Sequence, residues 1–115
     1  MPSVRRGTRI SYQMRITVRS LDGLSFHQPC VTLVVNPQGC ALRCGRPLEL
    51  GTRVRLEDLP SGQAVTAKVV NCISLGKYEN FWILGLNLDE PGNVWGVANP
   101  PEDWSLACTE ISSGA

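Results

Sequence analysis

The stretch Ile10-Ser11-Tyr12-Gln13-Met14-Arg15-Ile16-Thr17-Val18-Arg19 alternates apolar and polar side chains without a break. Its apolar residues occupy the even positions and its polar residues the odd positions. A period of two is expected for a β-strand with one buried face and one face toward solvent. We expect this strand to end at Leu21-Asp22-Gly23, because Asp-Gly favours a turn with positive φ. The stretch therefore predicts a β-fold with one side covered by a core.

The rest of the chain continues in short apolar segments separated by turn signals. Further strands are predicted at residues 30–35, 40–44, 52–56, 63–75 and 81–88. In the long segment 63–75 the apolar residues Val65, Ala67, Val69, Ile73 and Leu75 stand at odd positions, as on one face of a strand. Turn signals every 8–12 residues or so are typical of an all-β sandwich or barrel. A closed or nearly closed barrel is favoured, because a small sheet with so many strands must hide its edges.

Length and composition favour a single domain. The chain has 115 residues, is 43% hydrophobic and 18% charged, and carries a formal charge of +1. We divide it into a flexible basic N-terminal leader (1–9), a barrel (about 10–90) and an irregular C-terminal tail (about 91–115) around Trp95 and Trp104. The near-balanced charge provides no global field for DNA or an anionic membrane. No apolar run reaches the ~18–20 residues of a transmembrane helix, and no signal peptide is evident, so we expect a cytoplasmic protein without membrane insertion.

The cysteines are expected to be structural. Five of them occur, an odd number that favours free thiols in a reducing compartment. A zinc site built from His27, Cys30, Cys40 and Cys44 is the alternative, but no second close cysteine pair completes a tetrahedral set. We therefore predict small buried side chains and no metal, and we place His27 and the nearby Pro29 in a loop.

Catalytic chemistry is not indicated by the pattern of charged residues. The carboxylates come as adjacent pairs, Glu57-Asp58, Asp89-Glu90 and Glu102-Asp103. Adjacent residues on a strand point to opposite faces, so such pairs are more typical of solvated charge than of a catalytic dyad. Glycine-rich phosphate loops of the dinucleotide or P-loop type are absent from the sequence. The expected role is that of a binding module, without catalytic residues.

The N-terminal arginines are the candidate binding residues. Arg5 and Arg6 precede Gly7-Thr8, and Arg9 stands directly before the first strand. A guanidinium group donates paired hydrogen bonds to phosphate or to the O6 and N7 atoms of guanine, and its plane stacks on bases. A leader hinged at Gly7 would let these three groups fold back over one face of the barrel.

Arg5-Arg6-Gly7-Thr8-Arg9 before a β-strand resembles the RxxxR motif that opens PilZ domains, the bacterial receptors for cyclic di-GMP. The resemblance extends over roughly residues 4–88, through Gly51-Thr52-Arg53-Val54-Arg55-Leu56 to Trp82-Ile83-Leu84-Gly85-Leu86-Asn87-Leu88, in the place of the family's closing strand. It implies a small six-stranded antiparallel β-barrel, often followed by a C-terminal helix. It also implies that Arg5 and Arg9 bind the phosphates and guanine edges of cyclic di-GMP, with Arg6 as a basic neighbour.

The family's second motif, [D/N]xSxxG, falls on the turn after the strand at 30–35. One register places Val35, Pro37 and Cys40 at the three motif positions, and the other places Asn36, Gln38 and Ala41 there. Both registers depart from the motif, and a hydrogen bond lost to a buried polar edge costs about 1–3 kcal/mol. The resemblance implies that Asn36, Gln38 and Gly39 form the second wall of the ligand site.

We expect a cytoplasmic receptor for cyclic di-GMP that acts on a protein effector. The competing hypothesis is a divergent PilZ-like adaptor that contacts proteins but has lost the nucleotide, because its turn is altered. A third hypothesis, a small barrel that binds single-stranded nucleic acid, is disfavoured by the near-neutral charge, since such proteins carry a positive groove along the strand.

Overall fold

The computed structural model describes residues 7–22, 25–76 and 80–104. Arg5, Arg6 and Cys108 lie outside the described residues, and so does Gly23 of the first predicted turn. The turn predicted before residue 81 is described only in part, because residues 77–79 also lie outside.

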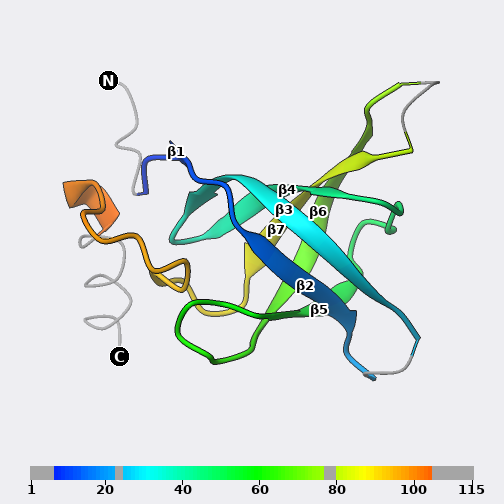
Figure 1. Cartoon of the computed structure of the whole chain (residues 1–115), viewed down its shortest axis with the longest axis horizontal. Helices are drawn as coiled ribbons and strands as arrows, with labels where there is room; N and C mark the ends of the chain where they lie inside the picture. Colours follow the sequence, from blue (N-terminus) through cyan, green and yellow to red (C-terminus); the bar gives the residue numbers. More distant parts are fainter. Residues whose placement is uncertain (1–6, 23–24, 77–79, 105–115) are drawn as a thin grey trace.

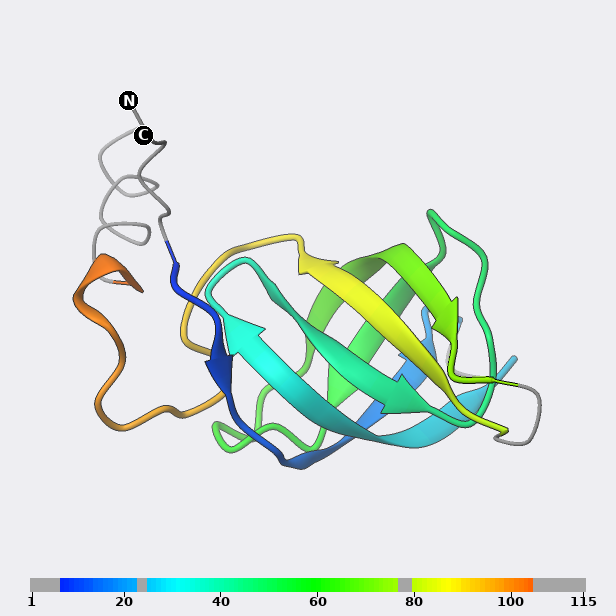
Figure 2. The same ribbon diagram turned by 90° about the horizontal axis from the view of Figure 1, so that it is seen from above.

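Six antiparallel strands form a closed barrel, as predicted (Figure 1). Their order is β3-β2-β5-β6-β7-β4, and β4 pairs back onto β3. A further short strand, β1, lies outside the barrel and pairs with the end of β3. Figure 2 shows β1 beside the cyan arrow of β3. The strands within the described residues are β1 (Ile10–Ser11), β2 (Arg15–Ser20), β3 (His27–Asn36), β4 (Gly39–Cys44), β5 (Arg53–Glu57), β6 (Val65–Ser74) and β7 (Trp82–Leu88).

The single strand predicted at residues 10–19 is divided into β1 and β2. From Ile10↔Val35 to Arg15↔Val31 the chain advances five residues against four on β3, so the pairing shifts by one. The side chain of the buried Thr32 of β3 is hydrogen-bonded to the irregular segment between the two strands. Its hydroxyl donates to the carbonyl of Tyr12 at 2.5 Å and accepts from the N–H of Met14 at 3.0 Å. The alternation of burial survives the shift, as the sequence pattern predicts.

A second irregularity lies in β6 and changes the direction of one predicted side chain. Between the pairs Val69↔Leu86 and Asn71↔Gly85, Val70 is an extra residue on β6, which is a β-bulge. Beyond the bulge the faces exchange. Ile73 stands at an odd position like Val69, but Val69 is fully buried and Ile73 is 49% exposed.

The loop predicted around His27 and Pro29 is wrong, because both residues belong to β3 and pair with β2. Proline in a strand loses no ladder hydrogen bond where its nitrogen faces an unpaired edge. β4 joins the other edge of β3 only from Val31 onward, so Pro29 lies where that edge has no partner strand.

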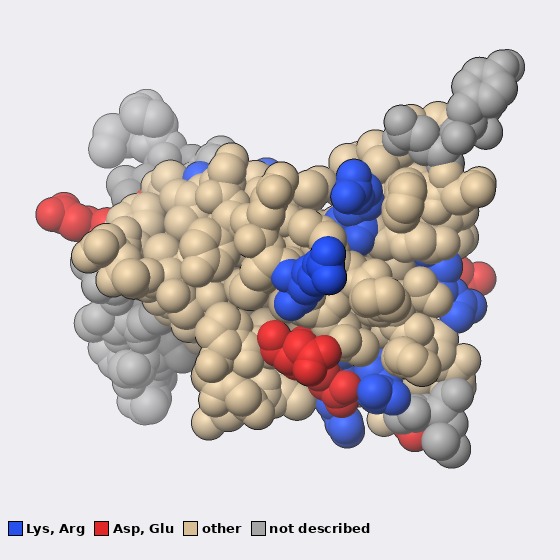
Figure 3. Space-filling model, viewed as in Figure 1, with Lys and Arg blue, Asp and Glu red and all other residues tan. Residues whose placement is uncertain are grey.

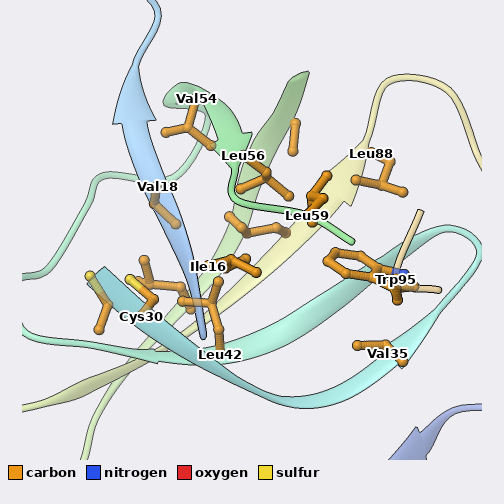
Figure 4. Packing of buried hydrophobic residues seen from close by; sticks show 14 of the residues in the cluster. Ile16, Val18, Cys30, Val35, Leu42, Val54, Leu56, Leu59, Leu88 and Trp95 are labelled. Atoms are coloured by element: carbon orange, nitrogen blue, oxygen red, sulfur yellow. The ribbon is translucent and has the colours of Figure 1, made fainter. Parts of the chain in front are cut away.

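The inward-facing side chains of all six barrel strands build one hydrophobic core, together with two tail tryptophans (Figure 4). Trp95 lies near Val35, Leu59 and Leu88, and its indole N–H donates to the carbonyl of Asn36 at 2.8 Å. Trp95 and Trp104 are both buried. The described part of the tail contains no strand and only one helical turn at 102–104, in agreement with the predicted irregular tail.

Candidate functional site

A hollow of about 330 Å³ lies on the outer face of the barrel, over β3, β4, β7 and β6. Its floor follows from the register: Val34 pairs with Ala41, Ala41 with Gly85, and Gly85 with Asn71. Side chains at paired positions point to the same face of a sheet. Ala41 of β4 and Gly85 of β7 occupy the centre of this row. Among the described residues, no large side chain therefore fills the surface between Val34 of β3 and Asn71 of β6. The volume is in the range of small-molecule sites.

The rim of the hollow brings together residues that are distant in sequence. Arg9, from the segment before β1, lies on it together with Asn36, Gln38 and Gly39 of the β3–β4 turn. These four are the described members of the predicted site, so the leader and the turn do meet at one surface. Arg5 and Arg6, the other two predicted residues, lie outside the described residues.

Asn36 is the residue that holds the turn and the leader in place. Its side-chain oxygen accepts from the N–H groups of Gln38 (3.1 Å) and Gly39 (2.9 Å). Its amide nitrogen donates to the carbonyl of Gly7 at 3.1 Å. Both ends of the amide are thus bonded within the protein, so Asn36 positions the rim.

The leader is further tied to the tail by a group of contacts that we call the Thr8 clasp. The backbone N–H and the hydroxyl of Thr8 donate to the same carboxylate oxygen of Asp103, at 2.9 and 2.6 Å. The indole N–H of Trp104 donates to the carbonyl of Thr8 at 2.7 Å. The hydroxyl of Thr8, helped by the backbone N–H groups of Gly7 and Thr8, holds the pKa of Asp103 below its ordinary value. The predicted flexible leader is therefore hydrogen-bonded at Gly7 and Thr8.

Arg9 follows the clasp directly and is exposed on the rim. It makes no hydrogen bond or ion pair with any residue that the structure describes. Many other arginines are engaged in ion pairs or lie over aromatic rings: Arg19 and Arg55 with Glu57, Arg53 with Asp89, Arg43 over Phe81 and Arg46 over Phe26. An unpaired guanidinium on the rim of a hollow is available for an anionic ligand.

Two polar residues on the hollow were not singled out from the sequence. Asn71 follows the bulge on β6, and Asn87 lies on β7 opposite Gly39. Both are exposed. The signal that could have found Asn87 is its place in an otherwise apolar strand, two residues after Gly85 and hence on the same face. Asn71 could not be placed in this way, because the bulge at Val70 interrupts the alternation.

Some of the carboxylates that were predicted as solvated charge bind neighbouring side chains. Glu57 accepts from Arg19 at 2.8 Å, Asp58 accepts from the hydroxyl of Thr17 at 2.5 Å, and Asp89 accepts from Arg53 and Thr66. Figure 3 shows basic and acidic side chains next to one another across one face of the molecule. On this face the charged side chains of the described residues therefore form no broad patch of one sign.

The described cysteines are free, and two of them lie in the core. Cys30 and Cys44 are buried on the paired strands β3 and β4, and the Cys30 thiol donates to the carbonyl of Gln28 at 3.6 Å. The neighbouring thiol of Cys30, with help from Arg46 and Gly45, lowers the pKa of Cys44 to about 7, whereas the neighbouring thiol of Cys44 and burial raise the pKa of Cys30. Burial raises the pKa of Cys40 to about 12. Within residues 7–22, 25–76 and 80–104, no cluster of three or more His, Cys, Asp or Glu is arranged to hold a metal ion.

No protein-family model matches the chain, and no curated protein matches its sequence. Among the described residues there is no helix with the length and apolar character needed to cross a membrane.

Proposed function

We propose that the protein is a cytoplasmic receptor of PilZ type that binds cyclic di-GMP in the hollow over β3, β4, β7 and β6. The observation that carries the proposal is the meeting of Arg9 with the β3–β4 turn on one rim, as the resemblance implies. The sequence resemblance is local, and the rim adds a spatial argument to it. The two segments are separated by more than twenty residues, and the Asn36–Gly7 hydrogen bond joins them.

The chemistry of the rim suits an anionic purine nucleotide. Among the described residues that line the hollow, Arg9 is the one with a charged side chain. Its guanidinium has several donors, which match phosphate oxygens and the O6 and N7 acceptors of guanine. The ligand would lie across the leader and the turn, next to the Thr8 clasp. Binding there would alter the surface formed by the leader and tail, where we place the contact with a protein effector.

Calorimetric titration with cyclic di-GMP, with GTP as the control ligand, tests this function. We expect binding in the sub- to low-micromolar range, and a loss of about tenfold or more in Arg9→Ala, because a hydrogen bond to a charged group contributes about 1.5–3 kcal/mol. Arg15→Ala is the matched control, since Arg15 is also exposed but does not line the hollow. It should bind within about twofold of the unchanged protein, given that surface substitutions have small effects. The absence of heat with a folded protein, or equal binding by Arg9→Ala, would contradict the proposal.

The alternative function is that of a PilZ-like adaptor without a nucleotide. It is favoured by the turn itself, where the amide of Asn36 is bonded within the protein and Gln38 stands at the position of the motif's serine. The variant Gln38→Ser/Ala41→Gly restores the motif while keeping Asn36. If the unchanged protein gives no heat and this variant binds cyclic di-GMP, the altered turn is the cause and the adaptor function is the better one.

A further inference from the structure

Two asparagines that line the hollow, Asn71 and Asn87, differ in how freely their amides can turn. Asn71 accepts the N–H of Cys72 on its side-chain oxygen at 3.0 Å. Because a backbone N–H can only donate, this bond identifies the oxygen and fixes the orientation of the amide. The end of the Asn71 amide that is not bonded to Cys72 is its NH2, which carries two donors. Asn87 makes no side-chain hydrogen bond to any residue within the described ranges, so its amide can present either end.

The floor between these residues suits a flat ring. Ala41 and Gly85 leave its centre without bulk, and the side chains of Val34 and Val70 add apolar surface beside it. A purine stacked on this floor would turn its edge toward the amides of Asn71 and Asn87. Side-chain amides and arginines are the groups that proteins use to recognise purine edges.

A donor fixed in position distinguishes the two purines. Guanine carries an acceptor, O6, at the place where adenine carries the donor N6–H2, and N7 is an acceptor in both. A site that presents NH2 from Asn71 and guanidinium N–H from Arg9 therefore offers donors from two side chains to the base. Guanine would satisfy these donors with two acceptors, whereas adenine would oppose one of them with its own amino group.

We propose that Asn71 selects guanine over adenine in this site, through the amide orientation that its hydrogen bond to Cys72 imposes. The inference rests on the proposed function and adds the residue that decides the base. Asn87, which is free to turn, contributes affinity to either purine.

The test reverses the hydrogen-bonding character of Asn71 without changing its shape. In Asn71→Asp one carboxylate oxygen keeps the bond to Cys72 and the other replaces the donor by an acceptor. Affinities for cyclic di-GMP and cyclic di-AMP are measured by calorimetry for each variant. We expect the unchanged protein to prefer cyclic di-GMP by at least about tenfold, since one well-made base contact discriminates by that much. Asn71→Asp should lower this preference by about tenfold or more.

Two further variants separate base selection from charge and from affinity. Asn80→Asp adds the same negative charge at an exposed residue that does not line the hollow, and should leave the ratio of the two affinities within about twofold. Asn87→Ala should weaken both ligands by similar factors. Urea unfolding of each variant confirms that the proteins compared are equally folded.

Each outcome bears on a stated claim. An unchanged ratio in Asn71→Asp, in a protein whose binding still depends on Arg9, would overturn the role of Asn71 and leave the receptor function standing. A ratio that falls equally in Asn80→Asp would also overturn it, because charge alone would then explain the effect. If neither dinucleotide binds the unchanged protein, the receptor function and the selectivity fall together.

Discussion

Gly39 is the residue whose size the site tolerates least. It lies in β4 opposite Asn87, and a methyl group added to it would overlap the carbonyl oxygen of Leu86 and approach the carbonyl carbon to 2.9 Å. The obstacle is backbone in the middle of a ladder, which has no rotamer through which to move aside. Gly39 is not among the positive-φ glycines of the chain, so close approach of β4 to β7 is what requires it.

The substitution Gly39→Ala should therefore destabilise the fold by about 3 kcal/mol, at the upper end of the usual cost of overpacking. Urea unfolding followed by tryptophan fluorescence measures the change. Gly92→Ala is the control, because a methyl group there would meet no atom within 4 Å and the φ of Gly92 is not in the left-handed region. Its unfolding free energy should stay within about 0.5 kcal/mol of the unchanged protein. Equal losses in the two variants would show that Gly39 is not held by close packing.

The residues of the site could be predicted from the sequence only where a local pattern marks them. Arg9 stands directly before the first strand that the alternation predicts, whereas Asn36, Gln38 and Gly39 were assigned only through the resemblance of the turn to the family's second motif. Asn71 depends on the bulge at Val70, and a bulge changes the facing of every residue beyond it. The hydrogen bond from the Asn36 amide to Gly7 could not be predicted either, because the two residues are distant in sequence and only the fold brings them together.

At the scale of elements, the Thr8 clasp joins the two ends of the described chain. It uses the leader before β1 and the helical turn at 102–104, which lie side by side in both ribbon views (Figures 1 and 2). β1 has only two residues and pairs with β3 alone. So short a strand gains little from its own ladder, and we infer that the clasp keeps it in place and holds Arg9 at the rim. The division of the predicted first strand into β1 and β2 also depends on a neighbouring strand, because the hydroxyl of Thr32 that is hydrogen-bonded to the break comes from β3.

The clasp should weaken in acid. The pKa of Asp103 is lower in the folded protein than in the unfolded chain, so its carboxylate stabilises the folded state above about pH 4. That contribution is lost as the pH falls through the lowered pKa of the folded state. In Thr8→Val the hydroxyl donor is absent, and the pKa of Asp103 should rise toward its ordinary value.

An NMR titration of the Asp103 carboxyl carbon measures this pKa, and the indole N–H signal of Trp104 reports on the clasp at the same time. Hydrogen exchange at Ile10 and Ser11 should be faster in Thr8→Val at neutral pH, while exchange at β5 stays unchanged. Thr52→Val is the control. Thr52 is half-buried, and its side chain makes no hydrogen bond to the described residues. An unshifted titration in Thr8→Val would mean that the hydroxyl does not set the pKa of Asp103.

In the whole molecule, the core of the barrel and the rim of the hollow meet at the β3–β4 turn. The turn that forms part of the rim receives the indole N–H of Trp95 on the carbonyl of Asn36. Trp95 itself is fully buried in the core. The closed barrel could be predicted from alternation and turn spacing. Which end Trp95 closes could not be predicted, because the tail has no apolar period that would orient it.

Loss of Trp95 should therefore weaken the site as well as the fold. Trp95→Ala leaves a large cavity and an unpaired carbonyl at Asn36, with an expected cost of about 3–5 kcal/mol, a large part of the stability of a small domain. Trp95→Phe keeps most of the packing but removes the N–H donor, and should cost about 1–3 kcal/mol. Because the carbonyl of Asn36 belongs to the rim, we also expect Trp95→Phe to bind cyclic di-GMP several-fold more weakly.

Val54→Ala is the comparison, since Val54 is fully buried on β5, a strand that does not line the hollow. At a temperature where both variants are folded, it should lose stability and keep its affinity. Equal affinities in the two variants would mean that the rim does not depend on the tryptophan beneath it.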